Sequence, residues 1–111
     1  MHERSVATTI ADAVRRRAHG HHVTRVQVKI GNLWQVTPRT LTRGWQALTK
    51  DTSLEGCSLV LEEVPARGRC RACGMEGALP PFPLSCSNCG SFDVEVMSGD
   101  ELLVGDLEVD E

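Results

Sequence analysis

Residues 70–90 read CRACGMEGALPPFPLSCSNCG and contain two Cys-x-x-Cys pairs. Cys70 pairs with Cys73 and Cys86 pairs with Cys89, and twelve residues separate the two pairs. Two cysteines three positions apart can place both sulfurs on one metal ion from a single tight turn, and a second such turn completes a tetrahedron. The stretch therefore predicts a small lobe built around a four-thiolate metal site.

Zinc is the metal that this ligand set and spacing favour. Four thiolates leave no open position for water or substrate, so we expect a structural Zn(II) site and not a catalytic one. The alternatives are a redox dithiol, an iron–sulfur cluster or disulfides. A redox Cys-x-x-Cys usually works alone at a helix N-terminus, whereas here two similar turns face each other. Gly74 and Gly90 follow the two pairs, and we expect each to take a positive φ that closes its turn.

The fifth cysteine, Cys57, stands apart in an alternating strand pattern, and we predict a buried core residue there. The odd count argues against a disulfide framework. The first ten residues, MHERSVATTI, contain no apolar stretch of the signal-peptide type. No apolar run approaches the ~20 residues of a membrane span. We therefore expect a soluble, cytoplasmic chain without a membrane partner.

The segments around the cysteine stretch alternate between helix and strand patterns. Apolar residues at helical spacing predict a first helix, with Ser5 as its N-cap. The pair Thr37-Pro38 is typical of a second helix start. The predicted helices cover residues 5–18 and 38–50, and the predicted strands cover 23–30, 57–64 and 102–109.

This order predicts an α+β fold, with two helices on a small mixed three-stranded sheet and an inserted zinc-ribbon lobe. We expect one domain from residues 1–64 plus 99–111 and a zinc-ribbon domain from residues 65–98. The core content of the insert is small, so it should fold only with its metal.

The charge of the chain is divided along the sequence. Its 111 residues carry a formal net charge of −3. Residues 1–71 hold all 12 Lys and Arg with six acids, and residues 72–111 hold nine acids and no Lys or Arg. A hydrophobic content of 41% is sufficient for a folded core.

The N-terminal tripeptide Met1-His2-Glu3 has the atoms of a planar chelate. The α-amine, the His2 amide nitrogen and the His2 imidazole can close adjacent rings around one ion, and Glu3 can supply a fourth ligand. Nitrogen-rich planar sets suit Ni(II) and Cu(II). A histidine at position 2 is more often only solvated, and the histidine tract of residues 19–22 is a competing site.

Taken together, these motifs resemble the HypA/HybF family of hydrogenase nickel-incorporation proteins over essentially the whole chain. The resemblance rests on the Met-His-Glu start, the Thr-Pro helix, the paired Cys-x-x-Cys and a final Gly99-Asp100-Glu101-Leu102 strand. It implies an α+β nickel-binding lobe with a zinc lobe inserted before the last strand.

The resemblance also implies ligands and partners. Ni(II), as a transient cargo, would be held by Met1, His2 and Glu3, and Zn(II) by the four paired cysteines. Family members are not enzymes. They pass nickel to the [NiFe]-hydrogenase large subunit with a nickel-handling GTPase, and some also serve urease. The chain departs from the family pattern at Arg4, Trp45 and Cys57, none of which removes a ligand.

The alternative interpretation is a zinc-ribbon adaptor that binds nucleic acid or protein without nickel transfer. Arg67, Arg69 and Arg71 lead into the ribbon and could contact phosphates. Because no Lys or Arg follows Arg71, acidic groups would repel a nucleic-acid backbone, and we expect no nucleic-acid partner. A thiol oxidoreductase would need a reactive thiolate that zinc-bound cysteines do not supply. The sequence is compatible with a monomer or a homodimer.

Overall fold

A computed structural model describes residues 3–80 and 83–110. The chain divides into two compact units. Unit 1 comprises residues 1–29, 36–62 and 103–111, and unit 2 comprises residues 30–35 and 63–102. No described helix is long and apolar enough to cross a membrane.

Helix α1 (Glu3–Ala18) buries one apolar face in unit 1. Its fully enclosed side chains recur at the spacing of three and four residues that defines a helix face, as in Val6, Ile10 and Val14. The predicted Ser5 cap is wrong, because the helix begins two residues earlier and Ser5 lies inside it. Glu3 consequently occupies the first turn, where the helix dipole favours a negative charge.

Helix α2 (Pro38–Thr49) packs against α1. Its predicted start is confirmed, since the Thr37 side chain accepts a hydrogen bond from the Thr40 amide at 3.3 Å. Trp45 is fully buried, and its indole Nε1 donates to the Cys57 carbonyl at 2.9 Å. Cys57 is itself buried, as predicted, and burial raises the pKa of its thiol.

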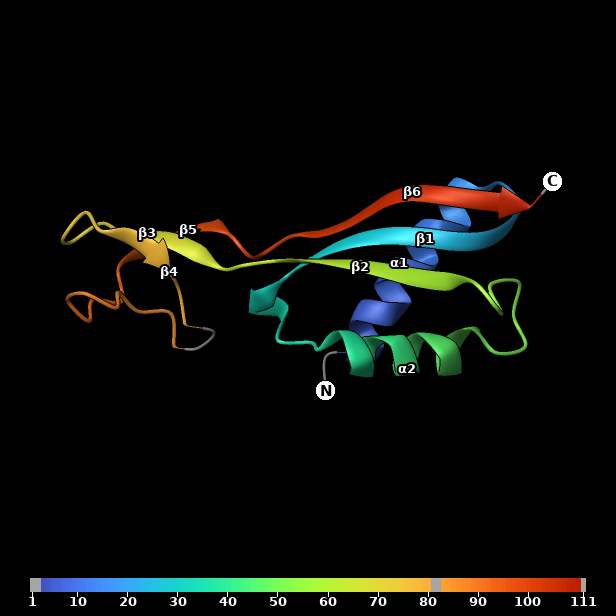
Figure 1. Cartoon of the computed structure of the whole chain (residues 1–111), viewed down its shortest axis with the longest axis horizontal. Helices are drawn as coiled ribbons and strands as arrows, with labels where there is room; N and C mark the ends of the chain where they lie inside the picture. The colour runs from blue at the N-terminus through green and yellow to red at the C-terminus, as the bar shows by residue number, and fades with distance from the viewer. Residues whose placement is uncertain (1–2, 81–82, 111) are drawn as a thin grey trace. The chain divides into compact units, whose positions relative to one another are not determined.

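The sheet of unit 1 has the strand order β2-β1-β6, from β1 (His22–Gly31), β2 (Ser58–Val64) and β6 (Leu102–Asp110). Figure 1 shows β1 and β2 running in the same direction and β6 in the opposite one, so the sheet is mixed. A parallel pair needs a long crossover, which the chain provides with α2. The last strand therefore returns to the first sheet, as the sequence predicts.

A second, antiparallel sheet forms unit 2, with β3 (Arg67–Cys70) between β4 (Glu76–Ala78) and β5 (Val94–Ser98). Residues 30–35, including the short 3-10 helix η1 (Asn32–Trp34), also belong to this unit. The Leu33 amide donates to the Gly99 carbonyl at 2.9 Å, and the Trp34 indole donates to the Asp100 carbonyl at 3.2 Å.

Folding redistributes the charge that the sequence divides in two. The acidic strand β6 lies in unit 1, where Glu108 pairs with Arg25 at 3.2 Å. Unit 1 thus holds nine basic and nine acidic residues, and unit 2 holds three basic and six acidic residues. The excess negative charge therefore belongs to the cysteine-bearing unit.

Candidate metal centre

Two turns of nearly identical geometry carry the four cysteines. In the first, the Gly74 amide donates to the Cys70 carbonyl at 2.8 Å, and in the second the Gly90 amide donates to the Cys86 carbonyl at 2.8 Å. Gly74 and Gly90 have φ of 81° and 79°, which confirms the predicted left-handed positions. Residues with a Cβ rarely adopt this conformation. The repeated Cys-x-x-Cys-Gly pattern is therefore what closes both turns.

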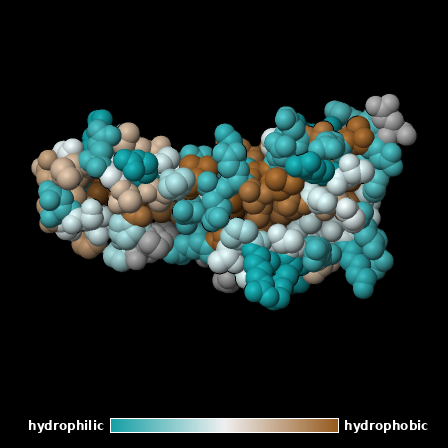
Figure 2. Space-filling model, viewed as in Figure 1, coloured by the Kyte–Doolittle hydropathy of each residue, from teal (hydrophilic) through white to brown (hydrophobic). Residues whose placement is uncertain are grey.

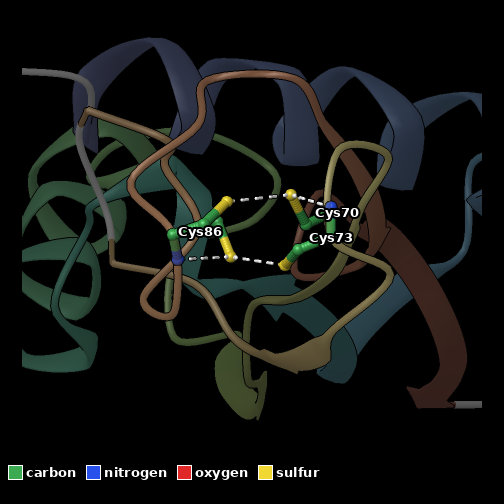
Figure 3. A group of neighbouring side chains, drawn as sticks. Cys70, Cys73 and Cys86 are labelled. Atoms are coloured by element: carbon green, nitrogen blue, oxygen red, sulfur yellow. Dashed lines mark hydrogen bonds between the residues drawn. The ribbon is translucent and has the colours of Figure 1, made fainter.

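The two turns bring all four sulfurs together. Every Sγ atom lies within 4.8 Å of the other three. The distance between Sγ atoms is 3.6 Å for Cys70 and Cys89, and 3.6 Å for Cys73 and Cys86. Figure 3 shows the labelled sulfurs of Cys70, Cys73 and Cys86 directed toward one another. A tetrahedral zinc with ~2.3 Å bonds to sulfur needs S···S separations of about 3.8 Å, so the set fits this ion.

Backbone amides point at the sulfurs, including those of Cys70 and Cys86. The Cys73 amide donates to Cys70 Sγ at 3.4 Å, and the amides of Asn88 and Cys89 donate to Cys86 Sγ at 3.3 and 3.4 Å. Donors directed at a sulfur stabilise its thiolate form, which is the form that binds metal. Cys70 and Cys86 are also buried, whereas Cys73 and Cys89 are exposed.

The crowded thiols differ strongly in acidity. Hydrogen bonds from the Met75 backbone and the Asn88 side chain lower the pKa of Cys73 to about 6. At Cys89 a backbone hydrogen bond from Ser91 lowers the pKa, but interactions with Cys70 and the other thiols raise it to about 11. A cation is therefore needed before all four sulfurs can be thiolates together at neutral pH.

Asn88 is a contributor that the sequence analysis did not single out. Its side-chain amide lies 3.6 Å from Cys73 Sγ, and its backbone amide donates to Cys86. Asn88 thus connects the second turn to the first. Because Asn88 lies between Cys86 and Cys89 in the sequence, a place near the metal centre could have been predicted for it. The spacing does not reveal that its side chain contacts Cys73.

The structure describes only part of the predicted nickel site. Glu3 is partly buried at the beginning of α1, whereas Met1 and His2 lie outside the described residues. Arg4 is exposed beside Glu3. Among the described residues, the four-cysteine cluster is the one group of three or more metal-binding side chains in ligating proximity. The competing site at the histidines of residues 19–22 stays a hypothesis.

The matches to known proteins include both the N-terminal tripeptide and the four cysteines. Residues 1–109 match the family model described as "Hydrogenase/urease nickel incorporation, metallochaperone, hypA". The chain belongs to the HypA family. It is 42% identical over 110 residues to the hydrogenase maturation factor HypA of Geotalea uraniireducens, with 99% of this chain and 100% of that protein covered. The HypA of Geobacter metallireducens is 39% identical over 110 residues, at the same coverage.

Solved structures of HypA proteins share the fold. The solution structure of the Ni metallochaperone HypA from Helicobacter pylori matches with a TM-score of 0.65 and 20% identity, covering 98% of this chain and 97% of that one. A second HypA solution structure matches with a TM-score of 0.57 and 23% identity, covering 98% and 96%. The α+β fold with a separate cysteine-bearing unit is thus the HypA fold.

Proposed function

We propose that this chain is a nickel metallochaperone for [NiFe]-hydrogenase maturation. Ni(II) would bind to the Met1 amine, the His2 amide nitrogen and imidazole, and Glu3. The observation that carries this proposal is the family match over residues 1–109, which spans the N-terminal tripeptide and the four-cysteine centre. The hydrogenase large subunit would receive the metal with the help of a nickel-handling GTPase, and the process would take place in the cytoplasm.

The start of α1 supports an N-terminal chelate. A helix provides no intrahelical acceptor for its first N–H groups, so metal binding to an amide nitrogen just before Glu3 breaks no helix hydrogen bond. A deprotonated amide and one carboxylate together neutralise Ni²⁺. The positive end of the helix dipole therefore does not oppose a site of zero net charge.

The chemistry would be ligand exchange without catalysis. A site at the end of the chain can be approached by ligands of an acceptor protein, which replace its own ligands one at a time. The amine and imidazole must lose their protons before they bind nickel, so acidification should release the cargo. We assign no residue an acid–base or nucleophilic role.

The paired cysteines would hold a structural Zn(II). Cys70, Cys73, Cys86 and Cys89 supply the four sulfurs. Unit 2 contains no histidine, so its own ligand alternatives to thiolate are carboxylates, which zinc binds less well than sulfur in such sites. Zinc would therefore stabilise this unit through all four cysteines.

The nucleic-acid adaptor has less support. Arg69 pairs with Glu76 at 3.2 Å, and Arg71 pairs with Asp93 at 3.1 Å. Two of the three arginines at the entry to the ribbon are thus engaged within unit 2. A zinc ion with four thiolates adds a formal charge of −2 to this already acidic unit, which further disfavours a phosphate backbone.

Nickel titration of N-terminal variants tests the proposal. One residue added before Met1, or the substitution His2→Ala, should abolish tight nickel binding and leave zinc in place. The double substitution His21→Ala/His22→Ala is the matched control and should change nickel affinity little. The opposite ranking would move the site to residues 19–22 and overturn the N-terminal assignment.

A further inference from the structure

The two cysteine turns share a backbone but differ in the side chain before their second cysteine. Ala72 holds this position in the turn of residues 70–73, and Asn88 holds it in the turn of residues 86–89. In both turns the amide of the second cysteine donates to the sulfur of the first at 3.4 Å. The amide of the first cysteine donates in both to the carbonyl five residues later at 2.8 Å. Ala72 and Asn88 are therefore equivalent in geometry, and their side chains make the two turns unequal.

This inequality falls on the two exposed sulfurs. Cys73 and Cys89 are exposed, whereas the first cysteine of each turn is buried. A backbone amide donates to each exposed sulfur. Cys73 also receives the side-chain amide of Asn88 at 3.6 Å, and within the described part of the chain this is the one hydrogen bond to a sulfur from a side chain other than cysteine. Ala72 has no polar side-chain atom to offer Cys89, which is left with fewer donors.

Attack by an electrophile depends on these differences. With zinc bound, all four sulfurs are thiolates, so exposure and hydrogen bonding decide which of them reacts first. A hydrogen bond to a thiolate is charge-assisted and weakens when the sulfur gives its electron pair to another atom, so each donor slows the reaction.

The surface of unit 2 favours an uncharged reagent. The unit holds three basic and six acidic residues, so it repels an anionic one. Figure 2 shows residues of intermediate hydropathy over much of the region that Figure 1 labels β3 to β5. A small uncharged electrophile can therefore approach the exposed sulfurs.

We propose that Cys89 is the reactive ligand of the metal centre, the sulfur that a small uncharged electrophile attacks first. Asn88 protects Cys73 from the same attack and is a positioning residue for that thiolate. The inference rests on the proposed zinc occupancy of the four cysteines. In the reaction with a maleimide, the bond between the metal and the Cys89 sulfur breaks and the sulfur bonds to one alkene carbon. Water supplies the proton that the other alkene carbon gains. The centre then keeps three thiolates, so this modification opens one coordination position.

Labelling of the zinc-loaded, full-length chain with limiting N-ethylmaleimide tests the inference. The rate at each cysteine is measured by mass spectrometry of peptides, after the zinc content of every variant has been determined. The variants are Asn88→Ala, Ala72→Asn and the double exchange Ala72→Asn/Asn88→Ala. Each places in one turn the side chain that the other turn already accommodates, so the backbone should be preserved. Ser87→Ala, in the second turn, is the matched control.

In the wild type, Cys89 should react about three- to tenfold faster than Cys73. Asn88→Ala should accelerate Cys73 until the two rates lie within about twofold, and Ala72→Asn should slow Cys89 by about three- to tenfold. The double exchange should make Cys73 the faster sulfur, and Ser87→Ala should leave the order unchanged. Because Ala72→Asn removes nothing from the centre, its result decides the question if Asn88→Ala loses zinc.

Three results would overturn the assignment of Cys89. These are equal rates at the two exposed sulfurs of the wild type, faster labelling of Cys73, and a Cys89 rate that Ala72→Asn does not lower, each with one zinc per chain. A wild type that holds no zinc would instead refute the zinc centre of the proposed function, and the inference with it.

Discussion

At the residue scale, the metal centre depends on neighbours that set the acidity of each sulfur. Hydrogen bonds from Met75 and Asn88 hold the pKa of Cys73 below its ordinary value, whereas the other thiols hold the pKa of Cys89 above its ordinary value. The sequence spacing predicted the four ligands and the two closing glycines. The spacing could not predict the difference between the pKa values of Cys73 and Cys89, because that difference arises from contacts between the two turns.

Zinc binding at neutral pH should release protons. With a pKa of about 11, Cys89 still carries its proton at pH 7 in the metal-free protein, whereas Cys73, with a pKa of about 6, is mostly deprotonated. The apparent zinc affinity should therefore fall by at least about tenfold for each unit that the pH decreases below 7. Calorimetry in buffers of different ionisation enthalpy measures the protons released. A pH-independent affinity with no proton release would contradict a thiolate site.

Gly99→Ala should strongly destabilise unit 2. Gly99 has a φ of 104°, and an added Cβ would lie 2.5 Å from the Ala66 Cα atom. The backbone strain and the clash together should cost at least about 2 kcal/mol of unfolding free energy. Gly77→Ala is the control in the same unit, since its Cβ would meet nothing within 4 Å. Thermal denaturation of the zinc-loaded variants measures the difference in stability. Equal stabilities of the two variants would contradict the close packing of Gly99 against Ala66.

At the element scale, the sequence predicted which segments form helices and strands better than where they begin. The apolar periodicity of α1 starts at Val6, so it gave no signal for the polar first turn that begins at Glu3. The Thr37-Pro38 pair fixed the start of α2 because capping is local chemistry. The sequence pattern predicted a last strand at residues 102–109, but its pairing with β1 is a long-range contact that the pattern itself does not encode.

Gly44→Ala should stabilise α2. The added Cβ would lie 3.8 Å from the Glu3 Cγ atom, an ordinary contact, while alanine loses less backbone entropy in a helix interior. We expect the free energy of unfolding to increase by about 0.5–1 kcal/mol. Thr37→Ala, which removes the cap, should cost about 1 kcal/mol. Chemical denaturation followed by the fluorescence of the buried Trp45 reports both changes. A loss of stability in Gly44→Ala would mean that the glycine is required for helix packing.

At the scale of the whole molecule, two units share one chain that crosses between them several times. The linear charge division suggested a basic half and an acidic half, yet unit 1 is neutral in formal charge because β6 returns to it. Residues 30–35 group with the cysteine-bearing unit through hydrogen bonds such as that from the Gly31 amide to the Glu101 carbonyl at 2.8 Å. No local pattern could reveal that contact across seventy positions.

Zinc removal should unfold unit 2 before unit 1. The second unit has short strands and few buried apolar side chains, whereas the two helices and β1 of unit 1 form a continuous apolar core. A chelator should therefore abolish amide protection in β3 to β5 and preserve it in α1 and β1. Hydrogen exchange resolves the two units. Amide protection that persists in β3 to β5 of the metal-free protein would show that unit 2 stays folded without zinc.

The most direct test is a nickel titration of the untagged protein with its native N-terminus, in which nickel and zinc are quantified separately. The wild type should bind one nickel and one zinc per chain. His2→Ala should bind no nickel and keep its one zinc. Retention of the nickel by His2→Ala, or loss of nickel only when the paired cysteines are changed, would contradict an N-terminal nickel site.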